Sequence, residues 1–150
     1  MESNVTGKVS LPPLAQIGMV VTDINAVMEF YAATFGIGPW QVRDGESEAQ
    51  SHGQTYRYKT RTAMAKFGPV TLELFQVIEG KSPVHSEFLD RGREGVHHIG
   101  FFVTKEERER LVNDLAGAGV GVFQERRSNL FLDTARIGGL FFEFIERPSP

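Results

Sequence analysis

The segment Gln16-Ile17-Gly18-Met19-Val20-Val21-Thr22 recurs later in the chain as His98-Ile99-Gly100-Phe101-Phe102-Val103-Thr104. The two copies share their Ile, Gly, Val and Thr residues, and each begins with a side chain that can bind a metal ion, Gln16 in one and His98 in the other. Self-similarity of this kind is typical of a duplicated structural unit. The sequence therefore predicts a chain built from two related halves.

A second pair of segments repeats in the same order. Gly68-Pro69-Val70-Thr71-Leu72-Glu73-Leu74-Phe75 matches Gly138-Gly139-Leu140-Phe141-Phe142-Glu143-Phe144-Ile145, with one glutamate inside each apolar run. The first pair is offset by 82 residues and the second by 70, so the first half carries 12 additional residues. The polar stretch 43–54 is the expected place for them, either as a lid over a ligand or as a surface loop without function.

The composition is that of an ordinary globular chain. It has 150 residues, 41% hydrophobic and 23% charged, which suits one compact domain assembled from two half-size units. The net charge of -3 gives no reason to expect a nucleic-acid partner. There is no apolar run of about eighteen residues and no signal-peptide pattern, so we expect a cytoplasmic protein without a membrane segment. Cysteine is absent, which leaves nitrogen and oxygen atoms as the ligands for any metal ion.

Hydrophobic periodicity predicts the element order β-α-β-β-β in each half. Thr22-Asp23 is a good N-cap for an amphipathic helix that begins at Ile24 and ends at Gly36, and Thr104-Lys105-Glu106-Glu107 matches a capping box. The predicted strands cover residues 14–21, 40–43, 56–65 and 70–78, then 96–103, 121–125, 130–135 and 140–146. The predicted divisions of this single structural domain are a loose arm at 1–12, a first module at 13–78, a connector at 79–95 with a short helix at 83–90, and a second module at 96–147.

Side chains alternate between the two faces of a strand, and this separates an apolar face from a mixed one. On each of four strands the mixed face carries a single polar side chain: Gln16, Glu73, His98 or Glu143. Buried carboxylates without partners shift their pKa or destabilise the fold, whereas one divalent cation would pair with these groups. Phe75, Phe102 and Phe141 lie on the same faces and are predicted to wall a substrate pocket.

These features resemble the vicinal oxygen chelate superfamily, which includes glyoxalase I, methylmalonyl-CoA epimerase, extradiol dioxygenases and bleomycin-binding proteins. The resemblance covers roughly residues 13–147 and rests on the paired modules, on Gly95-Val96-His97-His98-Ile99 and on the closing segment from Gly138 to Glu143. It implies an α+β fold in which two tandem βαβββ modules form a cupped, mostly antiparallel eight-stranded sheet with the helices outside. It also implies a homodimer.

The resemblance also implies a metal site. The set Gln16, Glu73, His98 and Glu143 is similar to the ligands of zinc-type glyoxalase I, and it implies a divalent metal: Zn, Co, Ni or Mn. The surrounding sequence looks more like methylmalonyl-CoA epimerases, but those usually have His where Gln16 stands and Glu where this chain has Ser51. The basic residues with which glyoxalase I holds glutathione have no match near the predicted ligands.

We therefore expect a metal-dependent epimerase or isomerase that moves a proton α to a carbonyl through a metal-stabilised enolate, with an acyl-CoA among the candidate substrates. The glyoxalase resemblance implies Glu143 or Glu73 as the catalytic base; otherwise the base comes from residues 43–54. The alternatives are a glyoxalase I-like lyase, the addition of a thiol or water to an epoxide, and a non-catalytic small-molecule binding protein that sequesters an antibiotic. An Fe(II) dioxygenase is disfavoured because the predicted ligand set contains one histidine.

For the other polar residues the sequence leaves open a role in the site and a role in the structure or surface. His97 is expected to point away from the metal, while His52 and His85 are expected in polar loops, with His52 as a candidate acid–base group. Five charged residues either contact the ligand, as anion-binding groups or bases, or belong to a solvated surface: Glu46, Glu48, Arg57, Lys59 and Arg61.

Overall fold

The elements of a β-α-β-β-β unit occur twice in the computed structural model, which describes residues 7–148. The first half consists of β1 (Leu14–Val20), α1 (Ile24–Phe35), β2 (Gln41–Ser51), β3 (Gln54–Phe67) and β4 (Val70–Gly80). The helix α2 (Pro83–Asp90) leads to the second half, which consists of β5 (Gly95–Val103), α3 (Lys105–Gly117), β6 (Val122–Glu125), β7 (Asn129–Leu132) and β8 (Phe141–Glu146). The predicted element order is confirmed.

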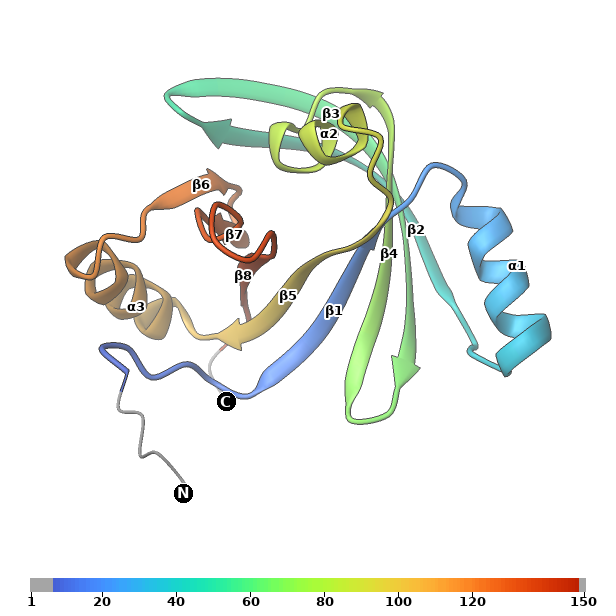
Figure 1. The fold of residues 1–150 in the computed structure, drawn as a ribbon, viewed down its shortest axis with the longest axis horizontal. Helices are drawn as coiled ribbons and strands as arrows, with labels where there is room; N and C mark the ends of the chain where they lie inside the picture. Colours follow the sequence, from blue (N-terminus) through green and yellow to red (C-terminus); the bar gives the residue numbers. More distant parts are fainter. Residues whose placement is uncertain (1–6, 149–150) are drawn as a thin grey trace.

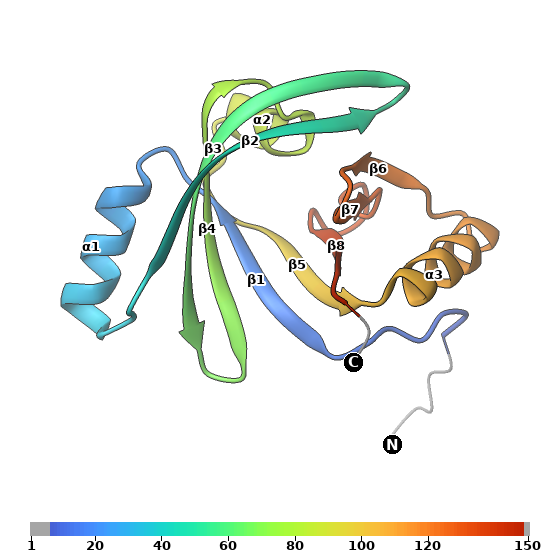
Figure 2. The same cartoon turned by 180° about the vertical axis from the view of Figure 1, so that it is seen from behind.

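The eight strands form one closed, curved sheet in the order β1-β4-β3-β2-β6-β7-β8-β5. The two halves meet at β1 and β5, which are antiparallel, whereas β1 is parallel to β4 and β5 is parallel to β8. On the other side the halves join through a single register pair, Gln50 with Glu125. Figures 1 and 2 show α1 and α3 on the outside of the curve. The predicted α+β class with a cupped, mostly antiparallel eight-stranded sheet is confirmed.

The helices begin where their capping residues predict. The Asp23 carboxylate accepts a hydrogen bond of 3.1 Å from the backbone N–H of Ala26, and α1 ends at Gly36, whose φ of 67° lies in the left-handed region. At α3 the Thr104 hydroxyl accepts from the Glu107 N–H and the Glu107 carboxylate accepts from the Thr104 N–H, which completes the capping box.

Each half buries its own apolar cluster beneath its helix. Beneath α1 the buried members are Val21, Ile24, Ala63 and Leu74. Beneath α3 they are Phe101, Val103, Leu111, Leu130, Leu132 and Phe144. Because both helices cover the outer face of the sheet, the polar side chains of the mixed strand faces are directed into its concave side.

The prediction of a short strand at 40–43 followed by a polar loop is wrong. Residues 41–51 form β2, which pairs with β3 from Gln41–Met64 to Ser51–Gln54. β2 and β3 have 11 and 14 residues, whereas the corresponding β6 and β7 have 4 each. The additional residues of the first half therefore lengthen a hairpin and do not form a separate lid loop.

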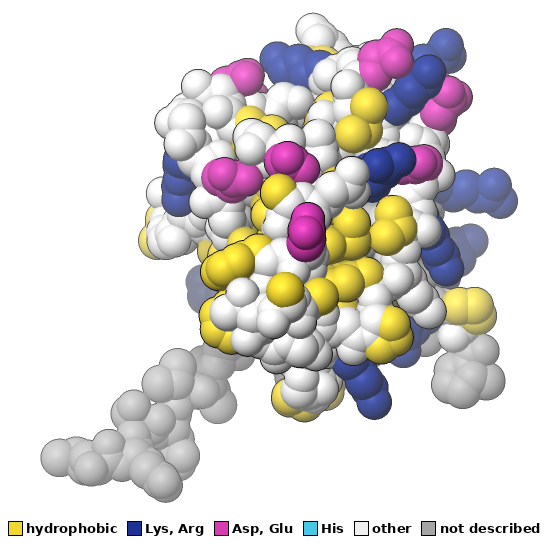
Figure 3. Space-filling view, turned by 90° about the vertical axis from the view of Figure 1, so that its right-hand side faces the viewer, with side chains coloured by type: hydrophobic (Ala, Val, Ile, Leu, Met, Phe, Trp, Pro, Cys, Tyr) yellow, Lys and Arg dark blue, Asp and Glu magenta, His cyan; other side chains and the backbone are white. Residues whose placement is uncertain are grey.

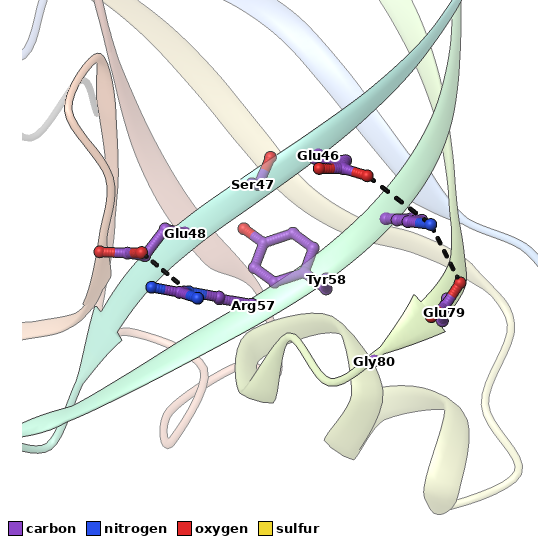
Figure 4. A pocket seen from close by; sticks show the side chains of 8 residues that line it. Glu46, Ser47, Glu48, Arg57, Tyr58, Glu79 and Gly80 are labelled. Carbon is purple, nitrogen blue, oxygen red and sulfur yellow. Dashed lines mark hydrogen bonds and ion pairs between the residues drawn. The ribbon is translucent and has the colours of Figure 1, made fainter.

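Opposite charges on the exposed face of this hairpin explain why the apolar alternation expected of a strand is missing. Figure 4 shows part of this face, where Arg57 lies 3.1 Å from Glu48 and Lys59 lies 3.6 Å from Glu46 and 3.4 Å from Glu79. Arg61 makes a two-pronged contact with Asp44, at 2.7 and 3.0 Å. These pairs favour the solvated-surface interpretation of the five charged residues.

Two predictions concern the ends of the chain and its surroundings. Residues 1–6 of the predicted arm lie outside the described residues, and residues 7–12 belong to no helix or strand. The module boundaries at 13–78 and 96–147 stay predictions. Within residues 7–148, none of the helices has the length and apolar character needed to span a membrane.

Hydrophobic side chains also lie at the surface, on the side of the molecule that carries α1 (Figure 3). Phe30 and Phe35 of this helix are 57% and 64% exposed. The homodimer that the family resemblance implies stays a prediction.

The buried cluster beneath α3 makes a direct stability prediction. Phe144 has no exposed surface, so Phe144→Ala leaves a cavity and should lower the free energy of unfolding by about 3–5 kcal/mol. The matched control is Phe35→Ala, where the ring is already mostly in water and the expected loss is below about 1 kcal/mol. Urea denaturation followed by circular dichroism measures both, and equal losses would contradict this description of the core.

Candidate functional site

The four predicted metal-ligand residues lie on four adjacent strands, β4, β1, β5 and β8. In one row of the sheet Gly18 pairs with Glu73 on one side and with His98 on the other. In the next row Gly100 pairs with Gln16 and with Glu143. The repeat thus places a glycine between two polar side chains in each row.

These glycines provide space for the neighbouring side chains. A Cβ atom on Gly18 would overlap the imidazole of His98. A Cβ atom on Gly100 would lie 2.9 Å from Ile145 Cδ1 and 3.1 Å from Gln16 Cβ. The shared glycine of the repeat is therefore needed for the polar side chains to lean across the β1–β5 junction.

The polar groups converge. His98 Nε2 lies 3.2 Å from Glu73 Oε1 and 3.7 Å from Glu143 Oε2. All four side chains are buried, and Gln16 Nε2 has no hydrogen-bond partner among residues 7–148. Gln16, Glu73 and Glu143 line one cavity of about 430 Å³, and His98 lies against them with no exposed surface. An amide, an imidazole and two carboxylates brought together in this way fit a divalent cation with nitrogen and oxygen ligands.

Burial and mutual charge perturb these groups. Burial is the main cause that raises the pKa of Glu143 to about 8; the Glu73 carboxylate adds to the rise, while His98 and Arg126 oppose it. Burial lowers the pKa of His98, but the charges of Glu143 and Glu73 outweigh burial and hold it above its ordinary value. Glu143 therefore keeps a proton at neutral pH that a bound cation would displace.

His97 determines which nitrogen of His98 carries a proton. Burial, followed by the charge of His98, lowers the pKa of His97 to about 3, so His97 is neutral. Its Nε2–H donates to the carbonyl of Val84 at 2.6 Å, which leaves Nδ1 as an acceptor 2.9 Å from His98 Nδ1. His98 Nδ1–H donates to it, and His98 Nε2 faces the two carboxylates. The β1–β5 register shifts beside His97, which brings its ring under α2.

The expectation that His85 lies in a polar loop is wrong. His85 belongs to α2, is 2% exposed, and stacks on Phe75 with ring centroids 3.9 Å apart. His85, His97 and His98 each offer a nitrogen atom within 4.8 Å of the others, so they form a histidine cluster that could bind a metal. No sequence pattern indicated this burial, because it depends on α2 folding over the sheet.

The three predicted pocket phenylalanines lie in different places. Phe75 lines the cavity. Phe102 lies outside the cavity lining, beneath the guanidinium of Arg147 at 3.2 Å from the ring centroid. Phe141 packs against His97 at 5.0 Å and lines a separate depression beside α2.

Sequence reasoning missed two aromatic residues that line the cavity, Phe131 and Tyr58. Phe131 pairs with Glu143 in the β7–β8 register, which no sequence pattern specifies. Tyr58 alternates with Arg57 and Lys59 along β3, and this polarity change was an available signal.

The other candidate acid–base groups lie farther out. His52 occupies the β2–β3 turn with a φ of 49° and packs edge-on against Phe123. Glu46 lines the cavity but is paired with Lys59, and Glu48 is paired with Arg57. No hydrogen bond or ion pair recorded for the described residues joins these three side chains to His98, Glu73 or Glu143.

Comparisons with known proteins identify the family of this chain and proteins that share its fold. The family model of the Glyoxalase/Bleomycin resistance protein/Dioxygenase superfamily matches residues 15–134. A solved variant of methylmalonyl-CoA epimerase from Streptomyces coelicolor, in complex with 2-nitronate-propionyl-CoA, is similar at 24% identity and a TM-score of 0.65, over 94% of this chain and 100% of that chain. Methylmalonyl-CoA epimerase from Mycobacterium tuberculosis is similar at 18% identity and a TM-score of 0.64, over 98% and 95%.

Among curated proteins, the uncharacterized protein YqjC of Bacillus subtilis (strain 168) is 33% identical over 89 residues. The match covers 59% of this chain and 55% of the relative, so the chain spans about half the length of that relative. At the identities of the solved structures, the likeness is one of fold.

The role of Gly18 can be tested by adding one methyl group. Gly18→Ala should push His98 away from Glu73 and weaken zinc binding by at least about ten-fold, the lower end for changes that misorient metal ligands. Gly117→Ala is the control, because no atom lies within 4 Å of a Cβ there. Calorimetric titration with zinc measures both folded variants, and an unchanged affinity in Gly18→Ala would contradict the site.

Proposed function

Since the chain belongs to the glyoxalase/bleomycin resistance protein/dioxygenase superfamily, we propose that it is a metal-dependent epimerase or isomerase that moves a proton α to a carbonyl group. Gln16, Glu73, His98 and Glu143 hold the divalent cation: Zn, Co, Ni or Mn. The observation that carries the proposal is the convergence of two buried carboxylates on His98 Nε2, at 3.2 and 3.7 Å, in the wall of a cavity.

We favour this ligand set over the histidine cluster on hydrogen-bonding grounds. Within that cluster both nitrogens of His97 are engaged, by Val84 and by His98, and His85 Nδ1 is engaged by Ser82 at 2.7 Å. A cation placed among the three rings would break those bonds and would lack a carboxylate to balance its charge. At His98 Nε2 a cation meets two carboxylates instead.

Each residue of the site has its own proposed role in the reaction. A divalent cation bound there would stabilise the negative charge that develops on a carbonyl oxygen as the α-proton leaves. Glu143 and Glu73 are the proposed catalytic residues that take and return the proton. His97 keeps the His98 ring in the orientation and tautomer that the site requires.

An acyl-CoA is the proposed substrate class. The cavity is lined by the apolar rings of Phe75 and Phe131 and by two cationic side chains, Arg43 and Arg126. A ligand with an apolar acyl part and an anionic group suits such a lining. The solved epimerase from S. coelicolor holds an acyl-CoA analogue in the same fold.

A cytoplasmic location stays a prediction.

Metal binding should release protons, because Glu143 with its pKa of about 8 is protonated at neutral pH in the metal-free protein. We expect at least about one proton released per metal ion near pH 7, and fewer near pH 9, where the carboxyl group is already ionised. Calorimetry in buffers of different ionisation enthalpy counts the protons. Metal binding without proton release near pH 7 would contradict the assignment of Glu143 as a ligand.

The reaction itself is tested by exchange of the α-proton. In deuterated water, methylmalonyl-CoA, other acyl-CoAs and 2-oxo acids are followed by NMR with the protein loaded with Zn, Co, Ni or Mn. We expect exchange at one α-position, loss of exchange in EDTA, and a fall of at least about 10²-fold in Glu143→Gln or Glu73→Gln. Glu109→Gln, on the exposed side of α3, is the matched control and should exchange at the wild-type rate.

The same experiment separates the alternatives. With the hemithioacetal of methylglyoxal and glutathione added to the panel, reaction of that compound alone would favour a lyase. Ligand binding that survives EDTA, without exchange, would favour a small-molecule binding protein and would contradict the enzymatic proposal.

A further inference from the structure

Unpaired polar atoms are concentrated around the cavity. Four buried side-chain atoms of the described residues have no hydrogen-bond partner: Gln16 Nε2, Trp40 Nε1, Tyr58 Oη and His85 Nε2. Three of the four belong to residues that line this one cavity. Leaving a buried polar group without a partner is unfavourable, so several such groups in one place indicate a ligand that completes them. Gln16 belongs to the proposed metal site, which leaves His85 and Tyr58 unexplained.

A chain of hydrogen bonds fixes the tautomer of His85. The Val84 N–H donates to Gln124 Oε1 at 3.1 Å, so the other amide atom of Gln124, Nε2, donates to Ser82 Oγ at 2.9 Å. The Ser82 hydroxyl is then free to donate to His85 Nδ1 at 2.7 Å. With Nδ1 accepting, the proton of neutral His85 resides on Nε2.

The His85 ring is held firmly. Its face stacks on Phe75, its edge meets Phe131 at 5.2 Å, and Ser82 and Gln124 are almost completely buried beneath it. With Nδ1 occupied by the Ser82 hydroxyl, the ring is a fixed hydrogen-bond donor at Nε2.

We propose that His85 Nε2–H is a ligand-binding donor, which holds an oxygen atom of the ligand in the cavity from the side of α2. The acceptor is a carbonyl or carboxylate oxygen, as the proposed substrate class carries. The inference therefore rests on the proposed function. His85 would bind one oxygen while the Gln16, Glu73, His98 and Glu143 site binds another. The two contacts together would orient the α-carbon between them.

The tautomer is tested first, without any ligand. In protein labelled with ¹⁵N at histidine, long-range ¹H–¹⁵N spectra distinguish a ring protonated at Nε2 from one protonated at Nδ1. We expect Nε2–H for His85, and a changed tautomer population in Ser82→Ala, where the donor to Nδ1 is lost. A His85 ring protonated at Nδ1, or at both nitrogens, would overturn the proposal.

Ligand binding is tested next, with zinc-loaded protein and two probes, malonate and 2-nitronate-propionyl-CoA. Binding should shift the His85 Hε2 resonance. His85→Phe keeps the ring stack but removes the donor, and should weaken probe binding about ten-fold while zinc stoichiometry and the circular dichroism spectrum stay unchanged. The control is His52→Asn, which removes an imidazole from the exposed β2–β3 turn and should bind as the wild type does.

The outcomes separate this inference from the proposed function. Probe binding of equal strength in His85→Phe and wild type would overturn the role of His85 and leave the metal site intact. If zinc binds but neither probe does, both the substrate class and the role of His85 fail. If zinc itself does not bind, the proposed function fails, and malonate binding to metal-free protein decides the role of His85: weaker binding in His85→Phe than in wild type supports it, and equal or absent binding overturns it.

Discussion

The close approach of β1 and β5 is the constraint on which the site depends. In a sheet each side chain has a neighbour directly beside it on the next strand, so two large polar groups cannot lean together unless the intervening residue is small. Gly18 lies between Glu73 and His98, and Gly100 lies between Gln16 and Glu143. The missing Cβ atoms create the space in which an imidazole and two carboxylates converge. The internal repeat places such a glycine in both β1 and β5, and the antiparallel β1–β5 junction brings the two copies together.

The convergence of the site residues buries two carboxylates beside an imidazole, and the surrounding protein provides hydrogen-bond partners for only some of these polar groups. Glu143 and Glu73 are buried beside His98, and burial raises the pKa of Glu143 to about 8. On the side of His98 that faces away from the cavity the hydrogen bonding is complete, because His97 accepts a hydrogen bond from His98 and donates one to the carbonyl of Val84. On the cavity side Gln16 keeps an unpaired amide nitrogen. The hydrogen bonds on the His97 side of His98 are all made, whereas the cavity side keeps an unpaired amide nitrogen. This arrangement fits a ligand or cation that enters from the cavity.

The sequence could predict what depends on local pattern or on the repeat. The capping residues Asp23 and Thr104 predicted both long helices, and the internal repeat predicted that Gln16, Glu73, His98 and Glu143 occupy equivalent strand positions. The hairpin of β2 and β3 was missed because its exposed face is held by pairs such as Arg61 with Asp44, whose partners are known only once the register is known. His85 was missed for a related reason: it lies in the connector at 79–95, which was predicted to be polar, and the burial of α2 is decided by contacts with Gln124, Phe131 and Phe75.

The division between repeated and unrepeated segments suggests how one fold serves several chemistries. The proposed cation ligands all come from positions that the duplication made equivalent. The remaining polar lining comes largely from segments that differ between the halves: the hairpin that is longer in the first half contributes Arg43 and Tyr58, and the connecting helix contributes His85. A change in those segments alters what the cavity accepts without disturbing the β1–β5 junction. Ligand choice in this chain therefore resides in its asymmetric parts, while the capacity to hold a cation resides in its symmetric ones.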